Sequence, residues 1–271
     1  MQILTFQTIP AAGRAMAEHV LRKVIAKPDG SRFFLGLPTG SSPLPFFDAF
    51  VDLARELPDH YKSHLATLMH IAVMDDFVDH NTGANLSSSD EWSAVGFMRL
   101  RFLEALRSAL APATMANEGR ILFPRVGHVR ELRQQIIEQG GLDIQIVATD
   151  PYEGHVAQNF TGEPYRKTEE EKYARLSEAF IRHHEWAERY RGITFDLDDF
   201  TEMVCANPNG EFLLVVTGPT QIQSTTRVSE QQNVRPELPL SFLWRSADRT
   251  SVFTDMMDAA GLVTVRGSGE K

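Results

Sequence analysis

The chain has 271 residues, of which 42% are hydrophobic and 23% charged, a composition typical of a globular protein with a sizeable core. Its formal net charge of -9 argues against nucleic acid as the main partner, because a phosphate backbone binds clustered Lys and Arg. The one cysteine, Cys205, excludes an intramolecular disulfide and a cysteine-rich zinc site, and fits a reducing, cytoplasmic setting.

Helical patterns and apolar runs alternate along the chain. Helices are predicted over roughly 10–27, 43–57, 91–110, 129–139 and 168–190. Strands are predicted in RFFLGLP, LMHIAVMD, ILFPR, LDIQIVATD, EFLLVVTG and LPLSFLWRS, with SVFTDMMDAAGL as closing elements. This alternation implies βαβ crossovers, and therefore a doubly wound α/β fold in which helices cover both faces of a largely parallel sheet, a Rossmann-like three-layer sandwich.

The organisation of the chain indicates one unit. No internal repeat and no long biased segment divides it, so we expect a single domain over residues 1–271. The N-terminal stretch has no basic region followed by an apolar run, and no apolar run is long enough to cross a bilayer. We therefore expect neither a signal peptide nor a membrane partner.

Four polar loops follow predicted strands. They are TGSS (39–42), DDF (75–77), EGH (153–155) and GPTQ (218–221). In doubly wound folds ligands bind at the carboxyl ends of the strands. We therefore expect these loops to face one crevice.

The first of these loops contains Thr39, Gly40, Ser41 and Ser42. Its hydroxyls and the backbone N–H groups at a helix start suit a phosphate or a sugar oxygen, and glycine allows close approach. The alternative is a simple helix cap, with Pro43 in the first turn and no ligand.

Asp75 and Asp76 are predicted to lie at the exit of a buried strand. A carboxylate there can move a proton between adjacent carbons if its surroundings hold its pKa near working pH. The alternative is structural, because aspartate also favours turns and helix caps.

The third loop pairs Glu153 with His155 two residues later. The carboxylate can orient the imidazole, which leaves the other ring nitrogen as an acid or base. A divalent ion held by these residues and the two aspartates is a rival, but no recognised ligand spacing supports it.

No Walker motif and no GxGxxG motif occurs, so no nucleotide cofactor is predicted, and we expect neither a metal nor an organic cofactor. His183 and His184 lie in the charged pattern at 168–190, and we expect them to face solvent.

The order of the motifs LGLPTGSSP, VMDDF, EGHVAQN and LLVVTGPTQ resembles the glucosamine-6-phosphate deaminase/6-phosphogluconolactonase family. That family reads broadly LGLPTGxTP, NMDEY, DGHIAFNE and LxGxxK in the same order. The resemblance spans residues 33 to 260, and implies a doubly wound fold acting on a sugar or sugar phosphate.

The resemblance also implies residue roles. Asp75 would move the proton between C1 and C2, and the ring-opening pair would fall on Glu153 and His155. The loop at 39–42 would bind sugar and phosphate oxygens, with Asp76 beside it. Asn159 matches the asparagine of the deaminase motif, which favours the deaminase/isomerase branch over the lactonases.

Several positions depart from the family pattern. Pro151 and Tyr152 replace the glycine-rich turn before the histidine. The glutamate after the asparagine is replaced by Phe160, with Glu163 three residues further on.

The most consequential departure is that Gln221 stands where the family has a phosphate-binding lysine. Arg166, Lys167 or Arg227 are candidates to supply the missing charge. Loss of such a contact would cost about 1.5 to 3 kcal/mol, enough to alter substrate preference.

Three functions remain open from the sequence. The first is a sugar-metabolism enzyme that opens a ring and isomerises aldose to ketose, with deamination if the sugar carries an amine. The second is a hydrolase of a sugar lactone, and the third is a sugar-binding sensor without catalysis. A homo-oligomer is compatible with each.

Overall fold

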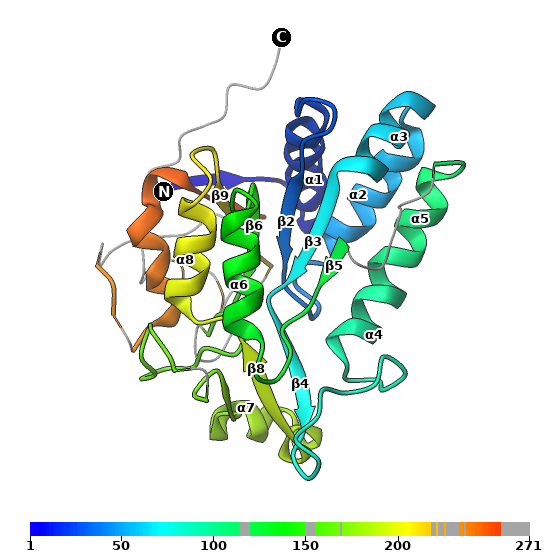
Figure 1. Cartoon of the computed structure of the whole chain (residues 1–271). Coiled ribbons are helices and arrows are strands. Elements are labelled where there is room, and N and C mark those ends of the chain that lie inside the picture. Colours follow the sequence, from blue (N-terminus) through cyan, green and yellow to red (C-terminus); the bar gives the residue numbers. More distant parts are fainter. Residues whose placement is uncertain are drawn as a thin grey trace.

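The computed structural model describes residues 1–113, 120–149, 155–168, 170–217, 221, 225, 233–235 and 237–255. A seven-stranded sheet crosses the middle of this described part, in the order β1-β10-β9-β6-β2-β3-β5 (Figure 1). Every neighbouring pair in it is parallel. Its strands are β1 (Gln2–Thr5), β2 (Phe33–Leu37), β3 (Met69–Val73), β5 (Ile121–Leu122), β6 (Ile144–Ala148), β9 (Glu211–Val216) and β10 (Thr250–Thr254).

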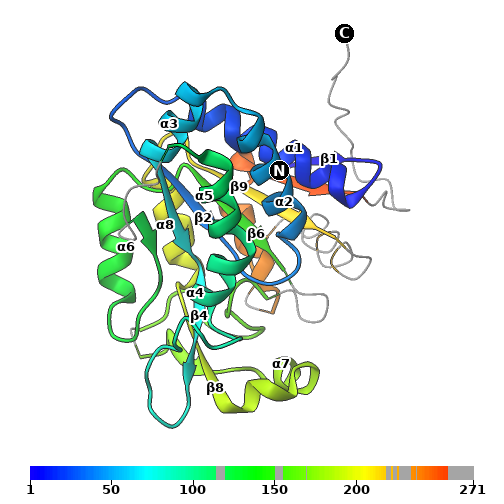
Figure 2. The same cartoon turned by 90° about the vertical axis from the view of Figure 1, so that its right-hand side faces the viewer.

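Helices cover both faces of the sheet (Figures 1 and 2). On one face lie α1 (Ile9–Ile25), α2 (Leu44–Glu56), α3 (Asp59–Leu68) and a run made of α4 (Ala94–Met98), the π-helical turn η1 (Arg99–Leu103) and α5 (Glu104–Leu110). On the other face lie α6 (Val129–Glu138), α8 (Leu197–Cys205) and the 3-10 segment η4 (Pro239–Arg249). The predicted doubly wound, three-layer α/β fold is confirmed.

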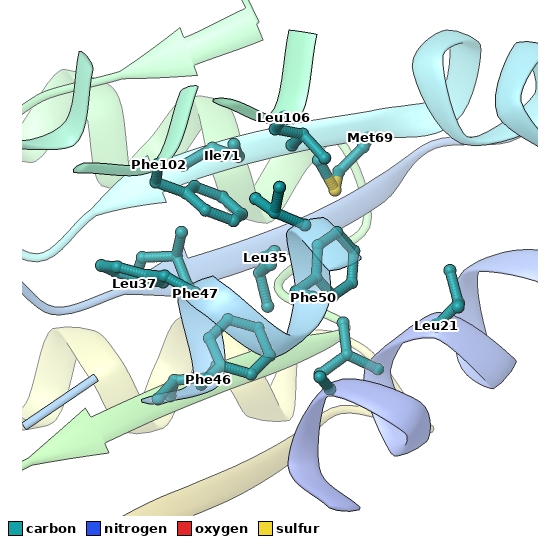
Figure 3. Packing of buried hydrophobic residues seen from close by; sticks show 14 of the residues in the cluster. Leu21, Leu35, Leu37, Phe46, Phe47, Phe50, Met69, Ile71, Phe102 and Leu106 are labelled. Atoms are coloured by element: carbon teal, nitrogen blue, oxygen red, sulfur yellow. The ribbon is translucent and has the colours of Figure 1, made fainter. Parts of the chain in front are cut away.

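Each face of the sheet carries its own hydrophobic core, because successive side chains of a strand point to opposite sides. In β2, Leu35 and Leu37 belong to the core under α1 and α2, whereas Phe34 belongs to the core under α6 and α8. Figure 3 shows the first of these cores, where Phe47 stacks on Phe102 with 4.7 Å between ring centroids. This packing fixes the helix run α4–η1–α5 against α2.

The strand order reverses between β2 and β6. From β2 the chain proceeds outward through β3 to β5, and it then returns to β6 on the other side of β2. Such a reversal leaves the two following loops diverging, which opens a crevice at the carboxyl ends of the strands.

A second, antiparallel sheet extends from this end of the molecule. It contains β4 (Asp75–Asp79), β8 (Tyr190–Thr194) and β7 (Tyr173–Arg175) in the order β4-β8-β7. The prediction that Asp75 and Asp76 lie at the exit of a buried strand is confirmed for β3, whereas the DDF segment, predicted as a loop, is the start of a strand. The buried strand β3 ends at Val73, and the two aspartates begin β4, paired with Thr194 and Ile193.

Two further predictions were wrong. The helix at 168–190 is reduced to α7 (Glu178–His183), followed by a 3-10 turn η3 (Glu185–Arg189) and preceded by β7. The charged pattern favoured a helix, but Lys172 is drawn into a buried ion pair with Asp199 and Tyr173 pairs with β8. The expected strand LPLSFLWRS is the 3-10 segment η4, which opens with Pro239 and buries Phe242 and Leu243.

No helix in the described part of the chain combines the length and the apolar character that crossing a membrane requires.

Candidate functional site

A cavity of about 860 Å³ opens at the carboxyl ends of β2, β3, β6 and β9. The loop after β2 contributes Thr39, Gly40, Ser41 and Ser42 to its lining. The chain after β3 contributes Asp75, the chain after β6 contributes Thr149 and His155, and the chain after β9 contributes Thr217 and Gln221. The four loops predicted from the sequence to share one crevice thus have described residues in the same cavity.

The loop after β2 turns sharply at Gly40, whose φ of +89° lies in the left-handed region that favours glycine. The helix α2 that follows has no side-chain cap hydrogen bond at its start. The hydroxyls of Ser41 and Thr39 therefore do not serve as its N-cap. They line the cavity instead, where the Ser41 hydroxyl can donate to a sugar or phosphate oxygen and both hydroxyls can accept from a sugar hydroxyl.

The Asp75 side chain is almost fully buried at the cavity wall. Its Oδ1 accepts a long hydrogen bond of 3.4 Å from the Thr39 hydroxyl. Burial, followed by the neighbouring Asp76 carboxylate, raises the pKa of Asp75 from 3.8 to about 7, against a smaller lowering by Thr39. Asp75 can therefore both accept and donate a proton near neutral pH.

Asp76 has a different environment, and it is not among the described residues that line the cavity. Its Oδ1 accepts hydrogen bonds of 2.8 Å from the backbone N–H groups of Phe77 and Ala94, and its Oδ2 accepts one of 3.3 Å from Asn85. Burial raises the pKa of Asp76 to about 6, although these donors act in the opposite direction. Asp76 anchors β4 to the start of α4 and so fixes the neighbouring Asp75.

His155 lies on the cavity wall among aromatic rings. Its ring centroid is 5.1 Å from that of Phe160, in an edge-on arrangement, and 5.7 Å from that of Phe180. Its backbone carbonyl accepts a 2.9 Å hydrogen bond from the Thr149 hydroxyl. Phe160 stands where the family has a glutamate. It packs against the His155 imidazole and fixes the orientation of that ring.

Asn159 does not line the described cavity, and its side chain instead holds the loop after β6 in place. Its Nδ2 donates to the carbonyl oxygens of Val156 at 3.0 Å and Phe195 at 2.9 Å. These bonds tie the loop after β6 to the end of β8.

Gln221 lines the cavity and hydrogen-bonds to the loops that follow β2, β6 and β9. Its Nε2 donates to the Thr149 carbonyl at 2.6 Å and to the Ser42 hydroxyl at 3.0 Å. Its Oε1 accepts from the Thr217 backbone N–H at 2.7 Å and from its hydroxyl at 3.2 Å. Both ends of the amide are used by the protein itself, so Gln221 joins the loops around the cavity.

We expect Gln221→Ala to lower the free energy of unfolding by about 2 to 3 kcal/mol, because several buried partners lose their hydrogen bonds. Ser42→Ala removes one of these bonds and should cost about 1 kcal/mol. Urea unfolding of both variants measures the difference. Equal losses would contradict the bridging role of Gln221.

The basic residues suggested as replacements for the family lysine do not reach the cavity as described. Arg166 forms ion pairs with Asp198, Asp199 and Glu202, and Lys167 is buried with its Nζ 2.6 Å from Glu163 Oε2. Two other predicted site residues, Glu153 and Arg227, lie outside the described residues, as do Pro151 and Tyr152.

Sequence reasoning missed part of the cavity wall. Phe77, Trp92, Phe97 and Phe180 give it an aromatic side, and Glu91, Arg101, Gln158 and His184 also line it. His184, expected to face solvent, lies with its ring 4.7 Å from Phe180. The spacing of Ala94, Phe97 and Arg101 is helical, but nothing in the sequence says which helix face meets a ligand.

Among the residues that the structure describes, no group of three or more His, Cys, Asp or Glu side chains has an arrangement that could hold a metal ion.

Comparison with known proteins gives structural matches. No protein-family model matches the sequence, and no curated protein does. A monomeric glucosamine-6-phosphate deaminase, described as the missing link of the NagB superfamily, matches with a TM-score of 0.73 and 17% identity, covering 94% of this chain and 97% of its own.

Two 6-phosphogluconolactonases also match. The protein from Thermotoga maritima has a TM-score of 0.59 and 15% identity, and covers 93% of this chain and 97% of its own. The protein from Plasmodium vivax has a TM-score of 0.62 and 12% identity, and the match covers 94% of this chain and 90% of its own.

The strand order and the cavity at its reversal define an α/β protein of the doubly wound class. Within that class, the chain has the fold of the glucosamine-6-phosphate deaminases and 6-phosphogluconolactonases. The resemblance seen in the sequence motifs is thereby confirmed at the level of the fold.

Proposed function

We propose that this protein is an enzyme that opens the ring of a sugar and converts the open-chain aldose into a ketose. When C2 of the sugar carries an amino group, the same reaction releases ammonia. The observation that carries the proposal is the position of Asp75, a carboxyl group at the cavity wall whose pKa is raised to about 7. A group that exchanges protons at neutral pH suits transfer between adjacent carbons.

The proposed reaction begins with His155, which carries a proton from the C1 hydroxyl to the ring oxygen as the C1–O bond breaks. The Asp75 carboxylate then removes the proton from C2, and the resulting acid returns it to C1, while a second proton moves from the oxygen or nitrogen on C2 to O1. With an amine at C2 the product is a C2 imine, which water hydrolyses to a ketose and ammonia. The Ser41 hydroxyl donates to a sugar oxygen and stabilises the enediolate charge, and the Thr39 hydroxyl, which donates to Asp75, can accept from a sugar hydroxyl.

Proton NMR in heavy water, with an ammonia assay on the same samples, tests this proposal. The panel pairs phosphorylated with free amino sugars and neutral sugars. Deuterium entering at C1 or C2 is the expected result. A folded protein that produces no exchange with any sugar would overturn the proposal.

The pH dependence of the reaction follows from the raised pKa of Asp75. The carboxylate form is the base, so kcat/KM should rise about tenfold per pH unit well below pH 7 and level off above it. Rates of isotope exchange between pH 5 and 8.5 measure this profile. A flat profile across that range would assign the proton transfer to another group.

Hydrolysis of a sugar lactone is the second candidate. His155 shares the cavity with Asp75 and can act as a general base for water, without any proton transfer between carbons. The likeness to solved 6-phosphogluconolactonases supports its inclusion. Lactone hydrolysis that persists in Asp75→Asn, without deuterium exchange, would favour this candidate.

A further inference from the structure

The described lining of the cavity contains a single Lys or Arg side chain, that of Arg101. Arg101 is exposed, and it forms no ion pair or hydrogen bond with the described part of the chain. Its neighbour Arg99, by contrast, lies 3.6 Å from Glu104 and donates to the Ser88 carbonyl. The Arg101 guanidinium is therefore available to a molecule in the cavity.

The two described cations considered above as replacements for the family lysine, and the buried Lys172, are already paired with carboxylates. Lys172 is buried between Asp196 and Asp199, and Arg166 and Lys167 bind acidic partners as described above. A negatively charged ligand group in the described cavity thus finds its complementary charge at Arg101.

The cavity wall along the helix run α4–η1–α5 is acidic at one end and basic at the other. Ala94, Phe97 and Arg101 all line the cavity, at a spacing that places them on one helix face. The Ala94 N–H donates to Asp76, so this end of the helix adjoins the aspartate pair, and Glu91 lies just before it. Arg101 is seven residues further on, about 10 Å along the helix axis.

The π-helical turn Arg99–Leu103 lies at this position in the helix run. Such turns widen a helix locally and often occur at functional sites. Phe102 on the same turn is fully buried against α2, which fixes the turn while Arg101 faces the cavity.

We infer that Arg101 is the specificity-determining residue that binds a phosphate group at the end of the sugar remote from C1 and C2. The orientation of the sugar rests on the proposed function, in which C1 and C2 lie at Asp75. A guanidinium presents a fork of N–H donors that matches two phosphate oxygens. The separation along the helix keeps that anion away from the acidic end of the cavity, and Gln221, saturated by internal bonds, has no donor left for it.

The test uses ligands that undergo neither isomerisation nor hydrolysis. Glucitol 6-phosphate and mannitol 6-phosphate are compared with glucitol, mannitol and inorganic phosphate, by isothermal titration calorimetry. The proteins are the full chain and its variants Arg101→Gln, Arg101→Lys and Arg107→Gln. Arg107 is an exposed arginine of α5 outside the described cavity lining, so it controls for net charge.

We expect the unmodified chain to bind a polyol phosphate about 10- to 100-fold more tightly than the free polyol. Arg101→Gln should erase that preference, Arg101→Lys should retain part of it, and Arg107→Gln should keep it. Thermal unfolding of Arg101→Gln should be unchanged, because the side chain is exposed and has no described partner.

Equal loss in Arg107→Gln would overturn the inference, since the effect would then be one of net charge. A phosphate preference that survives in Arg101→Gln, or no binding of either polyol phosphate by the unmodified chain, would overturn it as well. Because these ligands undergo no reaction, the result is separate from the isotope-exchange test of the proposed function. Either proposal can fail while the other stands.

Discussion

Asp75→Asn is expected to lower the rate of proton transfer at C2 about 100- to 10,000-fold, the range that a positioned acid or base contributes. The amide has the shape of the carboxyl group but cannot take up the proton. The measurement is deuterium exchange at C2 with a substrate found for the unmodified chain. A variant that exchanges at an undiminished rate would contradict the role of Asp75.

The stability of the same variant provides its control. The folded-state pKa of Asp75 is raised above its ordinary 3.8, so the unmodified chain loses stability as pH rises from about 4 to about 7. Asp75→Asn lacks this loss. Its Tm should therefore exceed that of the unmodified chain at pH 8, and the difference should narrow at pH 4. A lower Tm at pH 8 would mean that the carboxylate supports the fold.

Asp199→Ala is expected to lower the free energy of unfolding by about 3 to 5 kcal/mol. Asp199 is fully buried, and its carboxylate pairs with Lys172, with Arg133 Nε at 3.1 Å and with Arg166 Nη1 at 3.2 Å. It also accepts from the Asp196 backbone N–H in the capping box that starts α8. Removing it leaves the buried Lys172 without its nearest counter-charge.

Glu202 is the matched control for this change. It lies on the same helix and pairs with the same two arginines, Arg133 and Arg166, but its side chain is 38% exposed. Glu202→Ala should cost less than about 1 kcal/mol, because solvent screens an exposed pair. Denaturant unfolding of both variants gives the comparison. Similar losses of unfolding free energy in Asp199→Ala and Glu202→Ala would show that burial does not decide how much these ion pairs stabilise the fold.

The parallel sheet was predictable because its central strands are apolar on both faces. FFLGL and FLLVV are continuous buried runs, and a helix pattern follows or precedes each. The antiparallel sheet was not predictable in the same way. DDFVD in β4 and YAR in β7 are short and polar, and β4 pairs with a strand, β8, that is remote in the sequence. Strands of that kind form through contacts that a local pattern does not contain.

The candidate site, like the fold, was predictable only in part. Rules for doubly wound sheets placed the loops after β2, β3, β6 and β9 together, and their described residues share one cavity. The residue pattern alone did not separate Asp75 from Asp76, and only the family resemblance assigned the proton transfer to Asp75. Alternation in β4 and the backbone N–H of Ala94 give Asp76 a structural partner and leave Asp75 at the cavity wall. Similarly, the amide contacts of Gln221 depend on three strand ends meeting in space.

The pairing of the first strand with the last has a consequence for synthesis of the chain. Gln2–Thr5 hydrogen-bonds to Thr250–Thr254, so β1 has no sheet partner until nearly the whole described chain has left the ribosome. The inner strands β2, β3 and β6 can pair much earlier, since they lie within residues 33–148. Pairing in the order of synthesis therefore runs from β2, β3 and β5 across β6, β9 and β10, and β1 at the opposite edge is among the last strands to be protected from proteolysis in a nascent chain.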